Sequence, residues 1–282
     1  MYNYTEDALI EQPAIRLFEE LGWETANCYD EIAGPYSFLG RETRAEVVLV
    51  ARLRPALEQL NPDLPPEAIA AAIEELTRDR SIQTVVRANR DLYSQIKDGV
   101  RVVYMDEHGE EQVASVRVID WAQPEANDFF LASQLWITGD LYTRRPDLIG
   151  YVNGLPLVFI ELKNANVKLR QAFDKNLVDY KQDIPQLFTC NAFCVLSNAL
   201  ETKVGSFSAQ WEHFFKWLRA DDEKEPVNTK AVEAEGSSLK RLLHGLCPQE
   251  RLLDYLENFI LFHKDEAKNI AQNHQFIGVN RA

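Results

Sequence analysis

The chain has 282 residues, which is enough for one large domain or two small ones. Its 46% hydrophobic and 26% charged residues are an ordinary globular balance that can bury a core. No stretch approaches the roughly 18 to 20 apolar residues of a membrane span, and the N-terminus lacks the pattern of a signal peptide. Four scattered cysteines without a CxxC pair suit a reducing cytoplasm, and the five histidines show no zinc-ligand spacing.

The net charge of −14 by itself argues against a nucleic-acid-binding protein, because phosphate binding depends on lysine and arginine. The distribution matters more than the sum, since acids gather in the N-terminal helix and between 221 and 235. Cations gather in the middle of the chain, where they form either a local basic surface or ordinary solvated side chains. These cations are Arg144, Arg145, Lys163, Lys168, Arg170, Lys175 and Lys181.

Helical signals open the chain. Thr5-Glu6-Asp7 is a hydroxyl cap followed by acids, Pro13 places the start of the main helix nearby, and Gly22 is a typical helix stop. The apolar run 47–50 then predicts a strand, and Pro65-Pro66-Glu67 opens a second helix.

Strands dominate the next segment. Residues 100–105 and 113–120 predict two strands joined through His108-Gly109, and 131–137 is a further short apolar run. Asn153-Gly154 between two apolar runs is a strong hairpin signal, because a tight turn needs residues that tolerate positive φ.

The last part of the chain predicts mainly helices. Residues 167–180 have helical spacing, 193–196 form another buried strand, and 222–236 are polar enough for a loop. Two more helices are predicted at 239–246 and 252–260. An aromatic helix face, interpreted as core packing rather than a ligand site, comprises Trp211, Phe214, Phe215 and Leu218.

Three charged residues around the hairpin carry the candidate chemistry. Alternation along a strand points Glu161 and Lys163 to one side, and the hairpin brings Asp147 back toward Glu161. Charges at the end of a buried strand are costly without partners. Two carboxylates can hold Mg²⁺, whose other places go to water and a phosphate oxygen. Lys163 would orient or deprotonate that water, or offset charge on phosphorus. The pattern therefore predicts hydrolysis of a phosphodiester.

This arrangement requires a distortion of the hairpin. With a strict two-residue turn, Asp147 faces Ile160, so its side chain would point away from Glu161. We predict an extra residue in the turn, a bulge favoured by Pro156, or bent backbone at Asp147 after Pro146.

The segments Arg144-Arg145-Pro146-Asp147, Asn153-Gly154-Leu155-Pro156-Leu157 and Ile160-Glu161-Leu162-Lys163-Asn164 form a specific pattern. Weaker matches occur from Thr5-Glu6-Asp7 to Ser197-Asn198. Together they resemble the N-terminal part of the motor and nuclease (R, or HsdR) subunit of type I restriction enzymes. The resemblance implies a PD-(D/E)xK nuclease fold. This is an α/β (α+β) domain whose mixed β-sheet is flanked by helices, with additional N-terminal strands and C-terminal helices.

The resemblance also implies roles for single residues. Asp147, Glu161 and Lys163 would be the catalytic set, with Asp147 and Glu161 as ligands of Mg²⁺ or Mn²⁺. Asn176 and Tyr180, one helical turn apart, take the place of a Gln-x-x-x-Tyr motif near the scissile phosphate of DNA. Asn176 is one methylene shorter than the family's glutamine, and Tyr180 is alternatively a core or rim aromatic.

Two further polar residues have open interpretations. Glu11 is either an additional acid near the metal or a solvated helix carboxylate. Gln275 resembles the glutamine before the ATP-binding loop of helicase-like motors, yet the chain contains no GxxxxGK[ST] loop. ATP would therefore act only through a motor domain that this chain lacks. Residues 1–262 are predicted to form the endonuclease domain, with an active-site core at about 130–220, and 263–282 to begin a linker toward the motor.

The predicted function is a Mg²⁺-dependent endonuclease that cuts duplex DNA delivered by a motor. It would work in the cytoplasm, away from membranes, with methyltransferase (M) and specificity (S) subunits. The alternative is a docking or regulatory module with a nuclease fold and little cleavage, which Asn176 supports. A glycosidase with paired carboxylates is the weakest interpretation, because it gives Lys163 no role.

Overall fold

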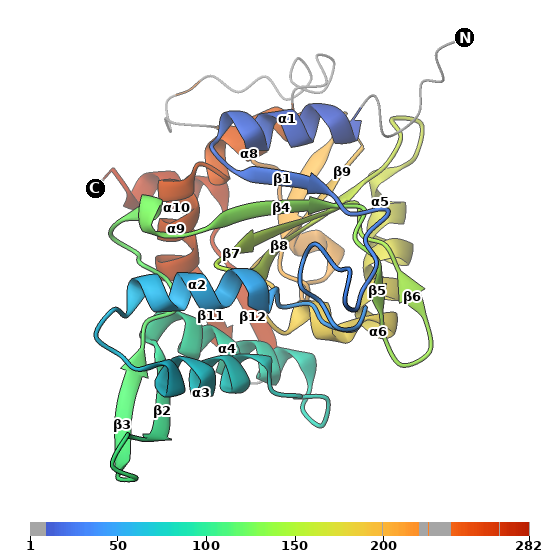
Figure 1. The fold of residues 1–282 in the computed structure, drawn as a ribbon. Helices are drawn as coiled ribbons and strands as arrows, with labels where there is room; N and C mark the ends of the chain where they lie inside the picture. The colour runs from blue at the N-terminus through green and yellow to red at the C-terminus, as the bar shows by residue number, and fades with distance from the viewer. Residues whose placement is uncertain (1–9, 199, 220–224, 226–237, 265, 282) are drawn as a thin grey trace.

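A six-stranded mixed sheet forms the centre of the computed structural model, with helices on both faces (Figure 1). The predicted class, a mixed β-sheet flanked by helices, is therefore confirmed. The predicted cap at 5–7 and, Glu225 apart, the predicted loop at 222–236 lie outside the described residues. The structure describes residues 10–198, 200–219, 225, 238–264 and 266–281.

The middle strands of the sheet are buried on both faces, which is why they are near-continuous apolar runs rather than alternating ones. In sheet order the strands are β1 (Glu24–Asn27), β4 (Phe129–Ser133), β7 (Leu148–Val152), β8 (Leu155–Leu162), β9 (Phe193–Ser197) and β10 (Thr202–Gly205). β8 pairs antiparallel with β7 and parallel with β9, and β1 pairs parallel with β4. The predicted hairpin at Asn153-Gly154 and the predicted strand at 193–196 are confirmed.

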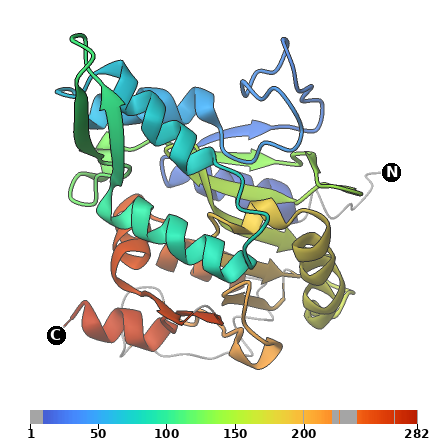
Figure 2. The same ribbon diagram turned by 90° about the horizontal axis from the view of Figure 1, so that it is seen from below.

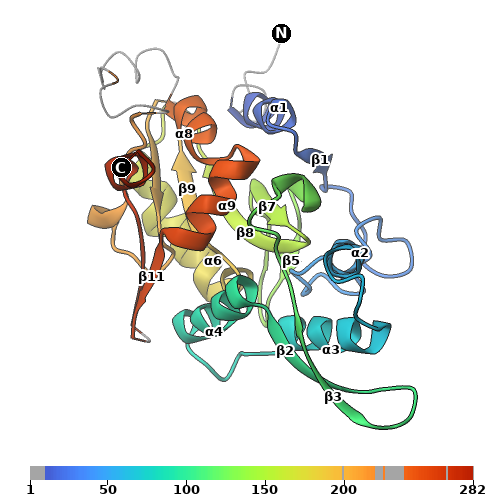
Figure 3. The ribbon, with the colours of Figure 1, turned by 90° about the vertical axis from the view of Figure 1, so that its left-hand side faces the viewer.

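One face of the sheet is covered by three helices from the two ends of the chain (Figure 3). They are α1 (Gln12–Glu20), α8 (Ser238–Leu246) and α9 (Gln249–Asn258), so the helices predicted there are confirmed. Phe193 of β9 packs edge-on against Tyr255 of α9, with ring centroids 5.8 Å apart. No helix among the described residues is long and apolar enough to cross a membrane.

A single helical segment covers the other face. It consists of α5 (Leu169–Gln171), a π-helical stretch η3 (Ala172–Leu177) and α6 (Val178–Asp183). The ring of Phe159 on β8 packs edge-on against Tyr180, with centroids 5.4 Å apart. Because side chains alternate along a strand, Glu161 faces the same helical segment as Phe159.

Three helices and a projecting hairpin form a layer at the side of the sheet (Figure 2). They are α2 (Val50–Leu60), α3 (Pro66–Thr77), α4 (Val85–Asp98), β2 (Val100–Met105) and β3 (Glu111–Val116). The predicted second helix and strand pair are confirmed, although β3 ends at 116 rather than 120.

The predicted strand at 47–50 is wrong. Leu49 donates its backbone N–H to the carbonyl of Gly154 at 2.8 Å, in the hairpin turn, and Val50 begins α2. The apolar run is buried against the turn instead of pairing within the sheet. Leu53 and Leu57 then continue the buried face with helical spacing.

The predicted aromatic helix around Trp211 is wrong, although its interpretation as core is confirmed for the buried Phe214. Only η5 (Trp211–His213) forms a short 3-10 turn. Phe215 then exchanges both backbone hydrogen bonds with Val204 of β10, at 2.9 and 3.0 Å, which requires extended backbone. The sheet edge has therefore overridden the helical spacing of these aromatic residues.

The end of the described chain packs onto α9. β11 (Ile260–His263) and β12 (Ala267–Ile270) form a hairpin, and α10 (Asn273–Val279) follows it. Phe276 of α10 lies 5.3 Å from Tyr255, measured between ring centroids. The described part of 263–282 therefore contains a strand and a helix, and its continuation toward a motor stays a prediction. The remaining short elements are η2 (Pro124–Ala126), β5 (Ile137–Thr138), β6 (Thr143–Arg144) and η4 (Pro185–Phe188).

Gly154→Ala is expected to destabilise the fold by at least about 2 kcal/mol. Gly154 has φ +75°, and an added Cβ would lie 2.4 Å from the Leu49 carbonyl oxygen and 2.8 Å from the Leu53 nitrogen. Gly109→Ala is the matched control, since Gly109 has the same φ of +75° but open space around it. It should cost only the backbone strain, about 1–2 kcal/mol. Urea unfolding measures both, and equal losses would show that the clash is relieved.

Candidate active site

The hairpin that carries the predicted acids contains a β-bulge. The register shifts between Gly150 and Tyr151, where Leu157 is the extra residue on the opposite strand. Beyond the bulge, each residue of β7 pairs with a β8 residue one position later than in a regular hairpin. Leu148 pairs with Ile160, so the continued register puts Asp147 opposite Glu161. The predicted distortion is confirmed, and it lies directly after the hairpin's proline, which cannot donate to the ladder.

Asp147 lies at the entrance to β7 and reaches across to the end of β8. One of its carboxylate oxygens accepts a hydrogen bond from the Leu162 backbone N–H at 2.7 Å. Burial raises the pKa of Asp147, whereas the Leu162 N–H and the positive charges of Lys163 and Arg145 act to lower it.

Glu161 is the most buried of the predicted catalytic residues, with 1% of its surface exposed. Burial, together with the negative charge of Asp147, raises the pKa of Glu161 to about 8. Lys163 opposes this shift by donating from Nζ to Glu161 Oε1 at 2.6 Å. The second oxygen, Oε2, is buried and accepts no hydrogen bond from the described residues.

Two carboxylates thus converge on a site with one ammonium group. At neutral pH a buried carboxylate in this position requires either a proton or a further cation. Oε2 of Glu161 and the carboxylate of Asp147 are hard oxygen donors of the kind that Mg²⁺ prefers. The described residues contain no cluster of three or more Asp, Glu, His or Cys side chains arranged to hold a metal. Water and substrate oxygens would therefore have to fill most positions around Mg²⁺.

Gln134 links a second acid to this pair. Its Nε2 donates to Glu11 Oε2 at 2.6 Å, its backbone N–H donates to the Asp147 carbonyl at 2.9 Å, and its side chain acts to lower the pKa of Asp147. Glu11 is only 5% exposed, so its interpretation as a solvated carboxylate is wrong. Its role as an additional acid near a metal stays a prediction.

Gln134 was not predicted as a site residue from the sequence. It follows the fully buried strand β4, and its φ of +57° is a strained conformation for a residue with a side chain. The signal that could have found it is the one used for Glu161, namely a polar residue directly after a buried apolar strand.

The two residues predicted to contact phosphate differ in their surroundings. Tyr180 is buried, and its hydroxyl donates to the Arg145 carbonyl at 3.1 Å. The same hydroxyl lies close enough to Glu161 for each group to affect the pKa of the other. Asn176 lies in the π-helical stretch and is half-buried. The structure thus brings Tyr180 to the site, and a phosphate contact of Asn176 stays a prediction.

Carboxylates neutralise several of the cations in the middle of the chain. Arg144 forms an ion pair with Asp183, and Arg170 forms one with Asp174 at 3.1 Å. Arg145 differs, because it has no ion pair within the described part of the chain and its guanidinium lies over aromatic rings instead. The predicted basic surface is therefore much weaker than the number of cations indicates.

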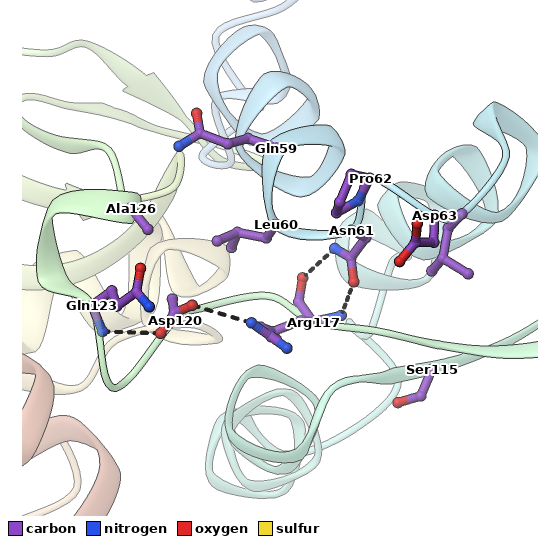
Figure 4. Close-up of a pocket in the computed structure, with 11 residues that line it drawn as sticks. Gln59, Leu60, Asn61, Pro62, Asp63, Ser115, Arg117, Asp120, Gln123 and Ala126 are labelled. Atoms are coloured by element: carbon purple, nitrogen blue, oxygen red, sulfur yellow. Dashed lines mark hydrogen bonds and ion pairs between the residues drawn. The ribbon is translucent and has the colours of Figure 1, made fainter.

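A pocket of about 670 Å³ lies away from the carboxylates, beside the end of α2 (Figure 4). Asn61 donates to the Arg117 carbonyl at 2.9 Å and accepts from the Arg117 N–H at 2.8 Å. Arg117 also pairs with Asp120 at 3.1 Å. These polar groups satisfy one another, and the predicted catalytic residues do not line the pocket, so it is not the candidate active site.

A mixed sheet with a bulged hairpin that joins two carboxylates and a lysine defines a restriction-endonuclease-like domain. Residues 3–213 match the family described as the type I restriction enzyme R protein N terminus, and the chain belongs to this family.

Two relatives match almost the whole chain. The type I restriction enzyme HindI endonuclease subunit of Haemophilus influenzae is 37% identical over 97% of this chain and 26% of its own length. A putative type I restriction enzyme MjaIXP endonuclease subunit of Methanocaldococcus jannaschii is 31% identical over 98% of this chain and 27% of its own length. The chain therefore spans about a quarter of the length of each relative.

Proposed function

We propose that this chain is the nuclease domain of a type I restriction endonuclease subunit and hydrolyses phosphodiester bonds of duplex DNA. The observation that carries the proposal is the register of the bulged hairpin, which sets Asp147 against Glu161 with Lys163 hydrogen-bonded to the latter. The names of the relatives, as endonuclease subunits of type I restriction enzymes, support the same function.

Asp147 and Glu161 would hold Mg²⁺, or Mn²⁺ in its place. When bound, such an ion polarises a phosphate oxygen and lowers the pKa of a coordinated water. The protein's own part begins with the proton of Glu161, which must leave before this carboxylate can act as a ligand. Lys163 lies at Glu161 Oε1 and would turn toward the attacking water or toward the charge that builds on the phosphate.

The acidic composition favours a domain that receives DNA from partners. A net charge of −14 opposes binding to the phosphate backbone. Methyltransferase and specificity subunits in the cytoplasm, and an ATP-driven motor in the same subunit, would then supply sequence recognition and delivery. Cleavage would follow translocation of the duplex by that motor.

The proposal is tested by cleavage of plasmid DNA by the parent complex with ATP and Mg²⁺. Glu161→Ala removes a predicted ligand, and Lys163→Ala removes the ammonium beside it. We expect each to lower the cleavage rate at least about a hundredfold, while ATP hydrolysis persists. Glu110→Ala, at an exposed glutamate in the β2–β3 turn, is the control and should cut normally.

The competing function is a docking or regulatory module with little cleavage. It is favoured by Asn176, which replaces the longer glutamine of the family's motif. The fold of this module would not respond to titration with Mg²⁺ or Mn²⁺. Glu161→Ala and Lys163→Ala would leave plasmid cleavage by the parent complex unchanged. Wild-type cutting by both site variants would therefore decide for the module.

A further inference from the structure

Two adjacent arginines before the hairpin have different partners. Arg144 is tied to acids of α6, through a short ion pair with Asp183 and a longer one with Asp179 at 3.7 Å. Arg145 forms no ion pair within the described residues, although this chain has 44 acidic residues. Among the described residues, the half-buried guanidinium of Arg145 therefore has no carboxylate partner, unlike that of Arg144.

Aromatic rings hold the Arg145 guanidinium in place. It lies 4.9 Å from the ring centroid of Tyr29 and 4.9 Å from that of Trp136. The two rings are 6.2 Å apart, and Trp136 Nε1 donates to the Tyr29 carbonyl at 3.2 Å. Stacking against ring faces leaves the N–H edge of a guanidinium available for an oxyanion.

Two anchors fix the cradle around Arg145, which is formed by the rings of Tyr29 and Trp136. Arg41 forms a buried ion pair with Glu31 and donates to the Trp136 carbonyl at 3.1 Å, which fastens the loop after β1 to the segment before β5. The Tyr180 hydroxyl holds the Arg145 backbone by donating to its carbonyl at 3.1 Å. Figure 1 shows this loop beside β5 and β6. The guanidinium is thus held in position before any ligand arrives.

The loop after β1, which carries Tyr29, exposes several aromatic side chains. Tyr29 and Phe38 of the loop are 50% and 59% exposed, and Tyr36 is 89% exposed. Tyr142, on the turn between β5 and β6, is 57% exposed, and its ring centroid lies 5.9 Å from the guanidinium of Arg144 rather than that of Arg145. An arginine that lies over aromatic rings and has no ion pair among the described residues is chemically suited to bind a phosphate.

We propose that Arg145, which lies over the adjacent rings of Tyr29 and Trp136, binds a DNA phosphodiester and places the strand next to Asp147 and Glu161. Arg145 lies two residues before Asp147, so a phosphate on its N–H edge is adjacent to the carboxylates. A planar guanidinium binds two phosphate oxygens at once, and in an acidic domain this contact carries much of the local attraction. The inference rests on the proposed function, because it assigns DNA as the substrate of the same site.

The test is binding of a short fluorescein-labelled duplex, measured by anisotropy at several salt concentrations. The protein carries Glu161→Ala, so that the duplex is not cut during the measurement. Arg145→Ala should weaken binding about tenfold and lower the salt dependence by about one counterion. Arg145→Lys should restore part of the affinity, since it keeps the charge and loses the planar fork.

Arg144→Ala is the matched control, because it removes an equal charge one residue away. It should lower the melting temperature by leaving Asp183 unpaired, with a much smaller effect on the salt dependence. If the Arg145→Ala fold is damaged, the double variant Tyr29→Leu and Trp136→Leu replaces it, and weaker binding is again expected.

Unchanged affinity and salt dependence in Arg145→Ala would overturn the inference. An absence of duplex binding at low salt by the Glu161→Ala protein with Arg145 intact would overturn it as well. These outcomes are separate from those of the cleavage assay. Cutting that does not depend on Arg145 would leave the nuclease function in place. Arg145-dependent binding without any metal-dependent cutting would leave a DNA-binding surface on a module that does not cleave.

Discussion

Glu161→Gln is expected to abolish cleavage and, in the absence of divalent metal, to stabilise the fold at pH 8 and above. The loss of cleavage follows because an amide cannot take the place of a carboxylate ligand beside Asp147. The gain in stability follows because wild-type Glu161 must ionise at a site where burial and the Asp147 charge oppose ionisation. The amide of glutamine keeps the shape of the side chain and has no proton to lose.

The direction with pH follows from proton linkage. The pKa of Glu161 is about 8 in the folded protein, against 4.5 without the shift. Between these two values the unfolded chain has released the proton and the folded chain still holds it. The free energy of unfolding of the wild type therefore falls as pH rises from 4.5 to 8, and it is constant outside this window as far as Glu161 is concerned. The difference amounts to a few kcal/mol, on the order of 3–5.

Urea unfolding in EDTA at pH 5 and at pH 8.5 measures this difference. The two proteins should be close in stability at pH 5, and Glu161→Gln should be clearly more stable at pH 8.5. Adding Mg²⁺ at pH 8.5 should stabilise the wild type and leave the variant unchanged, because ligand binding to the folded state adds to its stability. A variant that is less stable than the wild type at both pH values would show that ionisation of Glu161 does not destabilise the folded protein.

The hairpin shows how far sequence reasoning reaches. Asn153-Gly154 fixed the turn, because few residues tolerate the positive φ that both adopt here. Once the turn was fixed, period-2 alternation showed that Asp147 and Glu161 could share a face only through a register shift. The structure has that shift at Leu157. A local rule combined with a chemical requirement therefore predicted a backbone irregularity.

The wrong predictions have a common cause. The run 47–50 is apolar enough for a strand, and Trp211 begins a run with helical spacing, but neighbours distant in sequence decide both. Gly154 takes the backbone bond of Leu49, and Val204 takes those of Phe215. Short-range pattern contains no information about which unpaired sheet edge or turn lies nearby. The same limit explains Gln134, whose importance depends on Glu11, 123 positions away in the chain.

Two buried glutamates, Glu161 and Glu31, have different charged neighbours. Glu161 is opposed by a second carboxylate, whereas Glu31 is matched by Arg41, and both side chains of that pair are fully buried. Glu31 also accepts from the Ser37 hydroxyl at 2.6 Å, and Arg41 donates to two backbone carbonyls of neighbouring segments. The first arrangement suits a site that takes up a cation. The second suits a loop that must keep one conformation.

Arg41→Met is therefore expected to lower the free energy of unfolding by about 3–5 kcal/mol, because it leaves the Glu31 charge buried and unpaired. The control is the double variant Arg41→Met and Glu31→Leu, which removes both charges together. It should recover most of the loss, since replacing a buried ion pair by apolar side chains is often neutral or stabilising. Urea unfolding at pH 7 measures all three proteins, and the double-mutant cycle with Glu31→Leu gives the coupling energy.

The same variants separate stability from function at the rim of the site. Arg41 also holds the Trp136 carbonyl, so Arg41→Met should loosen the ring that stacks on Arg145. The double variant regains its charge balance but not this hydrogen bond. We therefore expect it to unfold like the wild type and still bind duplex DNA more weakly, by the anisotropy assay. Wild-type binding by the stable double variant would show that the cradle around Arg145 does not depend on the anchor at Arg41.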